Sequence, residues 1–356
     1  MDFSFNPFRG PMETPARNGS ILTFHRGLAA YAATPLVARP ELAAATGMGT
    51  VTVKDESSRF GLNSFKVLGA SWAMSRMAEN DGPPAPVAAA TAGNHGRAVA
   101  WMARQMGLRA FVFVPSGTSL RAVRNIRQEG AEIRIVPGNY EDAVSACECE
   151  SRRRGWRVVS DTAYPGCTEM PCHIVEGYRT LFEECEEQLP KLGLPAPDVV
   201  LVQAGVGGLL SAAVHHYRAR GDRPWLVSVQ PAEASALLQS IRSPGGQRCR
   251  STGARSSIMS VLNCAEVSMT AWSSIRSGVD LFLAIDDEYA LAAVRRLRDS
   301  GVAAGVSGAA GLAGLLALGG DARFAEAKSR LGLTGSSHAM VINTEGPLEV
   351  RKMARE

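Results

Sequence analysis

Short apolar runs rich in valine and isoleucine alternate along the chain with longer stretches that have helical periodicity. The predicted strands are VTV at 51–53, VAAA at 87–90, FVFVP at 111–115, EIRIV at 132–136, VVLVQ at 199–203, LVSVQ at 226–230 and MVIN at 340–343. Helices are predicted over 96–106, 119–128, 140–153, 169–188, 209–220 and 287–299. Strands that alternate with helices of this length indicate βα units, in which helices cover the faces of a mostly parallel sheet.

Composition places this α/β chain among globular proteins. Its 356 residues are 46% hydrophobic and 20% charged, which suits a large core and, most simply, two domains. The net charge of +4 is small and dispersed, so we expect no nucleic-acid partner. The chain has no apolar run of about 18 residues and does not begin like a secretory signal, so we expect a cytoplasmic protein without membrane contact.

Seven cysteines are scattered through the chain without a repeated metal-ligand spacing, so we expect reduced thiols. His215 and His216 are neighbours on a predicted helix and point about 100° apart, which disfavours joint metal binding. We therefore predict no metal. The segment 243–257, SPGGQRCRSTGARSS, has little to bury and is either a lid or a surface excursion.

A glycine-rich turn, Gly205-Val206-Gly207-Gly208, directly follows the strand VVLVQ and precedes the apolar helix that begins at Leu209. Glycines allow close backbone approach, and free N–H groups at a helix start favour an anion such as a phosphate. The same turn can also serve tight packing alone. It matches neither the P-loop nor the dinucleotide fingerprint, which argues against ATP and NAD.

A lysine, Lys66, lies at the start of a predicted helix in the motif Asn63-Ser64-Phe65-Lys66. The positive potential there, together with partial burial, is expected to lower its pKa and to prepare it for Schiff-base chemistry. A lone lysine in such a place is usually a solvated side chain, so the interpretation depends on its neighbours.

Two further motifs follow predicted strands. TAGNHG at 91–96 opens a helix and presents polar side chains and backbone N–H groups that suit a substrate carboxylate. NTEGP at 343–347 closes the strand MVIN and places Thr344 at a carboxyl end, where ligands of open α/β sheets bind. Each motif alone could be ordinary turn chemistry.

The order of these motifs, SFK then GNHG then GVGG then NTEG, resembles the fold type II family of pyridoxal 5′-phosphate (PLP) enzymes, which are tryptophan synthase β-like. Within it, the chain is similar to the diaminopropionate ammonia-lyases over roughly residues 20–350. The segments that carry this similarity are KDESSRFGLNSFKVLGA at 54–70, ATAGNHGRAVAW at 90–101, SDTAYPG at 160–166, LNCAEVS at 262–268 and GVSGAAGLAGLLAL at 305–318.

The resemblance implies a set of cofactor contacts. Lys66 would form the internal aldimine, Asn94 would bond the pyridine 3′-oxygen, and Thr344 would bond the ring nitrogen. A neutral hydroxyl beside that nitrogen favours β-elimination over deeper carbanion chemistry. The phosphate would be held by the backbone of Gly205, Val206, Gly207, Gly208 and Leu209.

The resemblance also implies the substrate contacts and the reaction. The substrate carboxylate would bind at Ser64, Thr91, Gly93, Asn94 and His95. The freed amine of Lys66 would remove the Cα proton of an L-amino acid, and the β-substituent would leave to give an aminoacrylate, then pyruvate and ammonia.

Asp161 in the DTA motif would bind or protonate the β-amino group of 2,3-diaminopropionate or of a related β-substituted L-amino acid. As an alternative from the residues themselves, Asp161 is a turn cap before TAYPG.

Two positions depart from the family pattern. The chain has Ala92 and Val306 where the lyases usually carry acids, and the acid at the first position is associated with the D-isomer. We therefore expect activity on L-substrates only, in a less anionic site that is less suited to a second ammonium.

Two other functions stay open. A β-replacement synthase would use the same aminoacrylate and the same cofactor residues, whereas a catalytically silent scaffold would have no chemical need for Lys66. By resemblance we expect a homodimer in which 1–67 and 161–356 form a PLP-anchoring domain. The smaller domain, 68–160, would close over the substrate carboxylate.

Overall fold

Two β-sheets organise the chain, whose computed structural model describes residues 2–12, 19–80, 84–91, 93–221 and 223–347. The strands in these ranges are β1 (Phe3–Phe5), β2 (Leu36–Ala38), β3 (Thr50–Asp55), β4 (Val87–Ala90), β5 (Ala110–Pro115), β6 (Glu132–Val136), β7 (Arg157–Val158), β8 (Val199–Gln203), β9 (Trp225–Pro231), β10 (Leu281–Ile285) and β11 (His338–Asn343). One sheet has the order β1-β10-β9-β8-β11-β3-β2 and the other β6-β5-β4-β7. Pairing is parallel except at β1 and β2, which form the antiparallel edges of the larger sheet.

Helices connect the strands and cover both sheets. The α-helices are α1 (Ser20–Gly27), α2 (Pro40–Thr46), α3 (Lys66–Asn80), α4 (Asn94–Gln105), α5 (Leu120–Gln128), α6 (Tyr140–Arg154), α7 (Glu169–Gln188), α8 (Gly208–Arg218), α9 (Ala236–Arg242), α10 (Met269–Gly278), α11 (Asp287–Asp299), α12 (Ala310–Gly320) and α13 (Ala325–Leu331). The 3₁₀ segments are η1 (Glu56–Gly61), η2 (Pro190–Leu192), η3 (Ala232–Ala234), η4 (Pro244–Gly246), η5 (Ser260–Leu262) and η6 (Ala322–Phe324). Among the helices of the described ranges, none combines the length and the apolar character that a membrane crossing requires.

The predicted α/β class is confirmed, and each strand and helix predicted from the apolar pattern is present. Strands β1, β2 and β7 have three residues or fewer and so carry no readable alternation. Strand β10 is the sequence LFLAI followed at once by a helix, so its periodicity cannot be told from that of a helix start.

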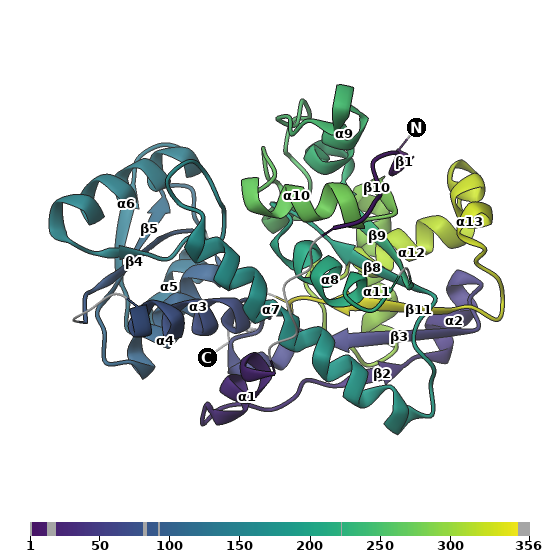
Figure 1. The fold of residues 1–356 in the computed structure, drawn as a ribbon, viewed down its shortest axis with the longest axis horizontal. Helices are drawn as coiled ribbons and strands as arrows, with labels where there is room; N and C mark the ends of the chain where they lie inside the picture. The colour runs from purple at the N-terminus through teal and green to yellow at the C-terminus, as the bar shows by residue number, and fades with distance from the viewer. Residues whose placement is uncertain (1, 13–18, 81–83, 92, 222, 348–356) are drawn as a thin grey trace, which may run out of the picture.

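The two sheets lie in different lobes, and α7 runs between them (Figure 1). Helices α3 to α6 surround the four-stranded sheet, whereas α8 and α10 lie over one face of the larger sheet and α2, α11, α12 and α13 over the other. The division into a PLP-anchoring domain and a smaller domain at 68 and 160 stays a prediction.

Helices α3 and α7 approach each other closely at two glycines. A Cβ added to Gly177 would collide with the carbonyl oxygen of Leu68, and one added to Gly69 would lie 2.5 Å from Cε1 of Tyr178. The glycines therefore allow the first turn of α3 to lie directly against α7.

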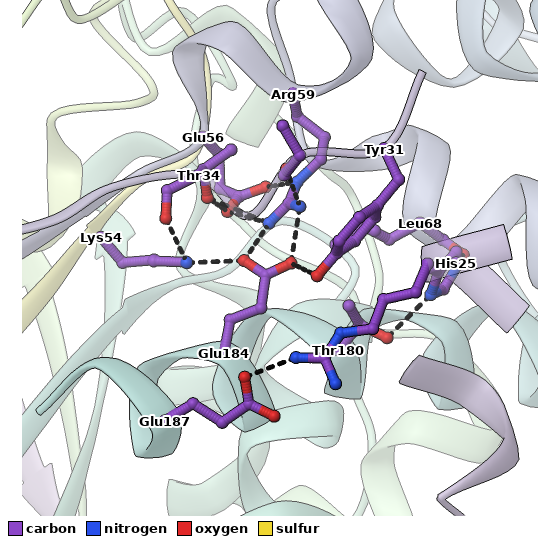
Figure 2. Close-up of polar contacts among 12 residues, drawn as sticks. His25, Tyr31, Thr34, Lys54, Glu56, Arg59, Leu68, Thr180, Glu184 and Glu187 are labelled. Atoms are coloured by element: carbon purple, nitrogen blue, oxygen red, sulfur yellow. Dashed lines mark hydrogen bonds and ion pairs between the residues drawn. The ribbon is translucent and has the colours of Figure 1, made fainter. Parts of the chain in front are cut away.

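Four fully buried charged side chains tie η1 to β3 and α7 (Figure 2). Glu184 on α7 accepts from Lys54 Nζ at 2.6 Å, from Arg59 Nη1 and Nη2 at 2.7 Å each, and from the Tyr31 hydroxyl at 2.8 Å. Glu56 accepts from Arg59 Nε and Nη2 at 2.8 Å each. Two positive and two negative charges balance in this network, so it holds η1 on the larger sheet without a net buried charge.

Candidate active site

Lys66 is the first residue of α3, a few residues after η1. Its Nζ lies 2.7 Å from Asp161 Oδ2, 5.4 Å from the ring centre of Phe65 and 5.8 Å from that of Tyr178. The backbone N–H of Phe65 donates to the carbonyl of Thr344 at 3.3 Å. The structure thus brings the predicted lysine, the predicted acid and the end of β11 together.

The ionisation of this pair differs from the expectation for Lys66. Burial acts to lower the pKa of Lys66, but the charge of Asp161 outweighs it and holds that pKa above its ordinary value. Burial acts to raise the pKa of Asp161, but Lys66 and then His95 hold it well below its usual range. The prediction of a lowered lysine pKa is therefore wrong for this state, because the helix-start argument left out a carboxylate that is distant in sequence.

The glycine turn joins β8 to α8 as predicted. Gly207 has a φ of 98°, a conformation that favours glycine, and α8 begins at Gly208. A Cβ on Gly205 would lie 2.8 Å from Cys264 Sγ, and one on Gly207 would lie 2.6 Å from Ile275 Cδ1. The first amides of α8, including that of Leu209, have no intrahelical carbonyl to bond, so this narrow turn fits a phosphate group.

The motif at 91–96 joins β4 to α4. The Gly93 N–H donates to Thr91 Oγ1 at 3.2 Å, and the Asn94 side-chain amide donates to Glu345 Oε2 at 2.5 Å. The buried ring of His95 has Nε2 at 2.8 Å from the Val159 carbonyl, and its Nδ1 is 3.9 Å from Asp161 Oδ2.

Ser64 also lies at this site. It forms an isolated antiparallel bridge with Glu345, and its Oγ accepts from the backbone N–H of Lys66 at 3.3 Å. Ser64, Asn94 and His95 are therefore linked to the surroundings of Lys66 from both lobes, through Glu345 and Asp161, and Thr91 and Gly93 belong to the turn that precedes Asn94. Ala92 lies outside the described residues.

The buried hydroxyl of Thr344 follows β11 and accepts from Gln203 Nε2 at 3.1 Å. Because that oxygen already has a donor, its hydrogen is available to a neighbouring acceptor such as a pyridine nitrogen. Val306 is partly buried and packs against the core of the larger sheet, so its position supplies an apolar side chain to this region.

Sequence reasoning missed four contributors to the site. Gln203 supports Thr344, and Tyr178 lies beside Lys66. The pKa of Tyr140 is raised first by burial of its hydroxyl and then by the charge of Asp161, although the residue as a whole is exposed. Glu345, which follows Thr344 and could have faced solvent, bonds Asn94 instead. The motif NTEG was a signal for Glu345, but the tyrosines become visible only when helices distant in sequence meet.

The segment 243–257 lies beside the start of α6. Arg250 pairs with Glu266 at 2.8 Å and with Glu141 at 3.2 Å, so this segment reaches from the larger lobe to the smaller one. A cavity of about 460 Å³ lies between this segment and the start of α6. It is lined by Asn139, Tyr140, Glu141, Arg250, Ala254, Arg255 and Asn263. Among the described residues, no group of three or more His, Cys, Asp and Glu side chains is placed to hold a metal ion, and the absence of a metal stays a prediction.

Residues 28–333 match the model of the pyridoxal-phosphate-dependent enzyme family. The chain belongs to this family. The diaminopropionate ammonia-lyase of Salmonella typhimurium is 36% identical over 355 residues, which cover 92% of this chain and 88% of that protein. The enzyme of the same name from Escherichia coli is 32% identical over 373 residues, which cover 98% of this chain and 92% of that protein.

A solved structure of a pyridoxal-phosphate enzyme supports the same relationship. The E. coli diaminopropionate ammonia-lyase in complex with an aminoacrylate-PLP azomethine reaction intermediate has a TM-score of 0.89 at 32% identity. It is matched over 98% of this chain and 94% of that chain. The predicted fold type II class, the resemblance to diaminopropionate ammonia-lyases and PLP as cofactor are thereby confirmed.

Proposed function

We propose that the chain is a PLP-dependent ammonia-lyase that converts L-2,3-diaminopropionate and water into pyruvate and two molecules of ammonia. The observation that carries this function is the partly buried pair of Lys66 and Asp161, 2.7 Å apart beside the glycine turn. An amine is present to attach the cofactor and to move a proton, and a carboxylate is present to hold a cationic β-substituent.

The residues of this chain divide the binding of PLP among them. Lys66 would attach its aldehyde carbon, and the backbone from Gly205 to Leu209 would hold its phosphate. Thr344 would bond the ring nitrogen and Asn94 the 3′-oxygen. When bound, PLP withdraws electrons from the substrate and thereby acidifies its Cα–H bond.

The protein's own groups then carry the proton and the leaving group. The freed Lys66 amine takes the Cα proton as general base. Asp161, whose pKa lies well below its usual range, stays ionised at neutral pH and holds the β-ammonium group. The Cβ–N bond breaks with its electron pair going to nitrogen, so the group departs as ammonia, and the released enamine hydrolyses to pyruvate and a second ammonia.

The carboxylate of the substrate binds at the junction of the two lobes, on Ser64, Thr91, Gly93, Asn94 and His95. Hydrogen-bond donors at the start of α4 and in its preceding turn favour an anion there. We further propose that residues 1–67 and 161–356 anchor the cofactor, and that 68–160 closes over the substrate. We expect the enzyme to be a cytoplasmic homodimer without a nucleic-acid partner. Size-exclusion chromatography with light scattering would test whether it is a dimer.

The test is the visible absorbance of the purified protein before and after L- or D-2,3-diaminopropionate, with pyruvate followed in the same cuvette. We expect a band of lysine-bound PLP that shifts, and pyruvate from the L-isomer alone. Pyruvate from the D-isomer would contradict the stereochemical expectation from Ala92. A shifted band without pyruvate, together with a new β-substituted amino acid when a thiol or amine is added, would point to β-replacement instead.

Lys66→Ala is the control for this test. It is expected to remove both the band and the turnover, because Lys66 is the lysine that the described residues place beside Asp161. A variant that kept its turnover would overturn the role of Lys66.

A further inference from the structure

Glu345 lies where segments of both lobes meet. Its backbone pairs with Ser64, its carbonyl accepts from the Gly305 N–H at 2.9 Å, and its side chain reaches α4 of the smaller lobe. There Oε2 accepts from Asn94 Nδ2 at 2.5 Å. A side chain that follows β11 therefore fixes a polar residue at the start of α4, across the line between the two sheets.

The surroundings of Glu345 make both of its protonation states accessible near neutral pH. Burial raises the pKa of Glu345 to about 7, against the hydrogen bond from Asn94 and the charge of Lys66. The other charged or titratable groups on the elements around it include His95 and Arg97 on α4, Asp55 at the end of β3, and Asp161, which pairs with Lys66.

The two protonation states make different demands on an asparagine amide. A carboxylate only accepts hydrogen bonds, so it holds the –NH₂ end of Asn94 towards Glu345 and turns Oδ1 the other way. A protonated carboxyl can donate to Oδ1, and the amide is then free to turn over. The polarity that Asn94 presents to the site thus depends on a neighbour from the other lobe.

We propose that Glu345 is a positioning residue for Asn94: its carboxylate fixes the amide at the start of α4, and its protonation releases it. The role deepens the proposed function, because Asn94 lies among the residues assigned to cofactor and substrate. This role also explains why the site contains the acid Glu345, although positions 92 and 306 carry no acid.

The variants that test this role are Glu345→Gln, which keeps an accepting oxygen but cannot ionise, and Glu345→Ala, which removes the acceptor. The matched control is Glu129→Gln, since Glu129 is another buried carboxylate that holds α4, through Arg97 at 3.1 Å and Arg104 at 3.0 Å. Each protein is loaded with PLP and studied from pH 6 to 9 in three ways: kcat/KM for pyruvate release, the visible absorption of bound PLP, and hydrogen exchange of the amides at 93–97.

We expect a titration near pH 7 in the absorption and in kcat/KM of the wild type, with kcat/KM falling towards acid. Glu345→Gln should lose this titration and Glu129→Gln should keep it. Glu345→Ala should show a kcat/KM about tenfold lower at pH 8, the effect of one lost hydrogen bond, and faster exchange at 93–97.

A titration near pH 7 that persists in Glu345→Gln would overturn the role of Glu345, as would wild-type exchange in Glu345→Ala. If no variant, nor the wild type, releases pyruvate, the proposed lyase function fails. The absorption and exchange measurements still decide the role of Glu345 in that case.

Discussion

Replacing Glu184 by glutamine should destabilise the protein severely. Glu184 accepts hydrogen bonds from Lys54, from two nitrogens of Arg59 and from Tyr31, at 2.6 to 2.8 Å (Figure 2). The side chains of Lys54, Arg59 and Glu184 are fully buried. The substitution leaves Lys54 and Arg59 with only Glu56 to balance them, a net buried charge of one. Breaking a buried ion pair by removing one partner costs about 3–5 kcal/mol, so we expect a loss of about 4 kcal/mol in the free energy of unfolding.

The assay is urea unfolding of the cofactor-free protein at pH 7.5, followed by tryptophan fluorescence and circular dichroism. The control is Glu187→Gln, three residues further along α7. Glu187 pairs with Arg26 at 2.5 Å, but both side chains are about half exposed, at 44% and 47%, so its loss should be below about 1 kcal/mol.

A second substitution tests the charge argument directly. Adding Lys54→Met to Glu184→Gln leaves the neutral pair of Arg59 and Glu56, so the double variant should be more stable than Glu184→Gln by about 1–2 kcal/mol. The reasoning is refuted if Glu184→Gln loses no more stability than Glu187→Gln, or if Lys54→Met destabilises the Glu184→Gln background as much as it destabilises the wild type.

Three further substitutions have defined outcomes. Asp161→Asn removes the charge that raises the pKa of Lys66, so Lys66 should react faster with free PLP at pH 7, as measured by stopped-flow absorbance. The same substitution should lower kcat/KM for L-2,3-diaminopropionate by about 10² or more in a pyruvate assay. Gly207→Ala puts a side chain at a φ of 98° and against Ile275, so it should lower the free energy of unfolding by about 1–3 kcal/mol and weaken PLP binding. Titration with urea measures the first effect, and titration with PLP measures the second. Because burial raises the pKa of Glu345 from 4.5 to about 7, its ionisation costs folding free energy above that pH and costs nothing below 4.5. Glu345→Gln should therefore be the more stable protein in urea at pH 8, by up to about 3 kcal/mol, and equal to wild type near pH 4.5.

The parts of the site that depend on local signals could be predicted from the sequence. The glycine turn at 205–208 follows a buried strand and opens a helix, and both features are readable within about ten residues. The resemblance to PLP enzymes added Asp161, which lies 95 residues beyond Lys66 in the chain. The effect of Asp161 on the lysine could not be read from either segment alone, and the expected direction of that pKa shift was wrong.

Contacts between segments far apart in the chain were the part that sequence could not supply. Asn94 and Glu345 are separated by 251 residues, and neither motif indicates that the other side chain lies opposite. Lys54 and Glu184 are charged residues inside a strand and a helix, where pattern alone would place them in solvent. Their burial follows from the contact between α7 and the end of β3, which joins segments 130 residues apart.

The glycines at the crossing of α3 and α7 limit how this enzyme can acquire a new substrate. Any side chain at Gly69 or Gly177 would separate the two helices and carry Lys66 away from Tyr178 and the glycine turn. Single substitutions at Gly69 and Gly177 are thus not tolerated, whatever substrate is selected for. New specificity would have to arise elsewhere around the site, in the turn before α4, the start of α6 and the loop around Val306, and a library designed to redirect the enzyme would vary those segments.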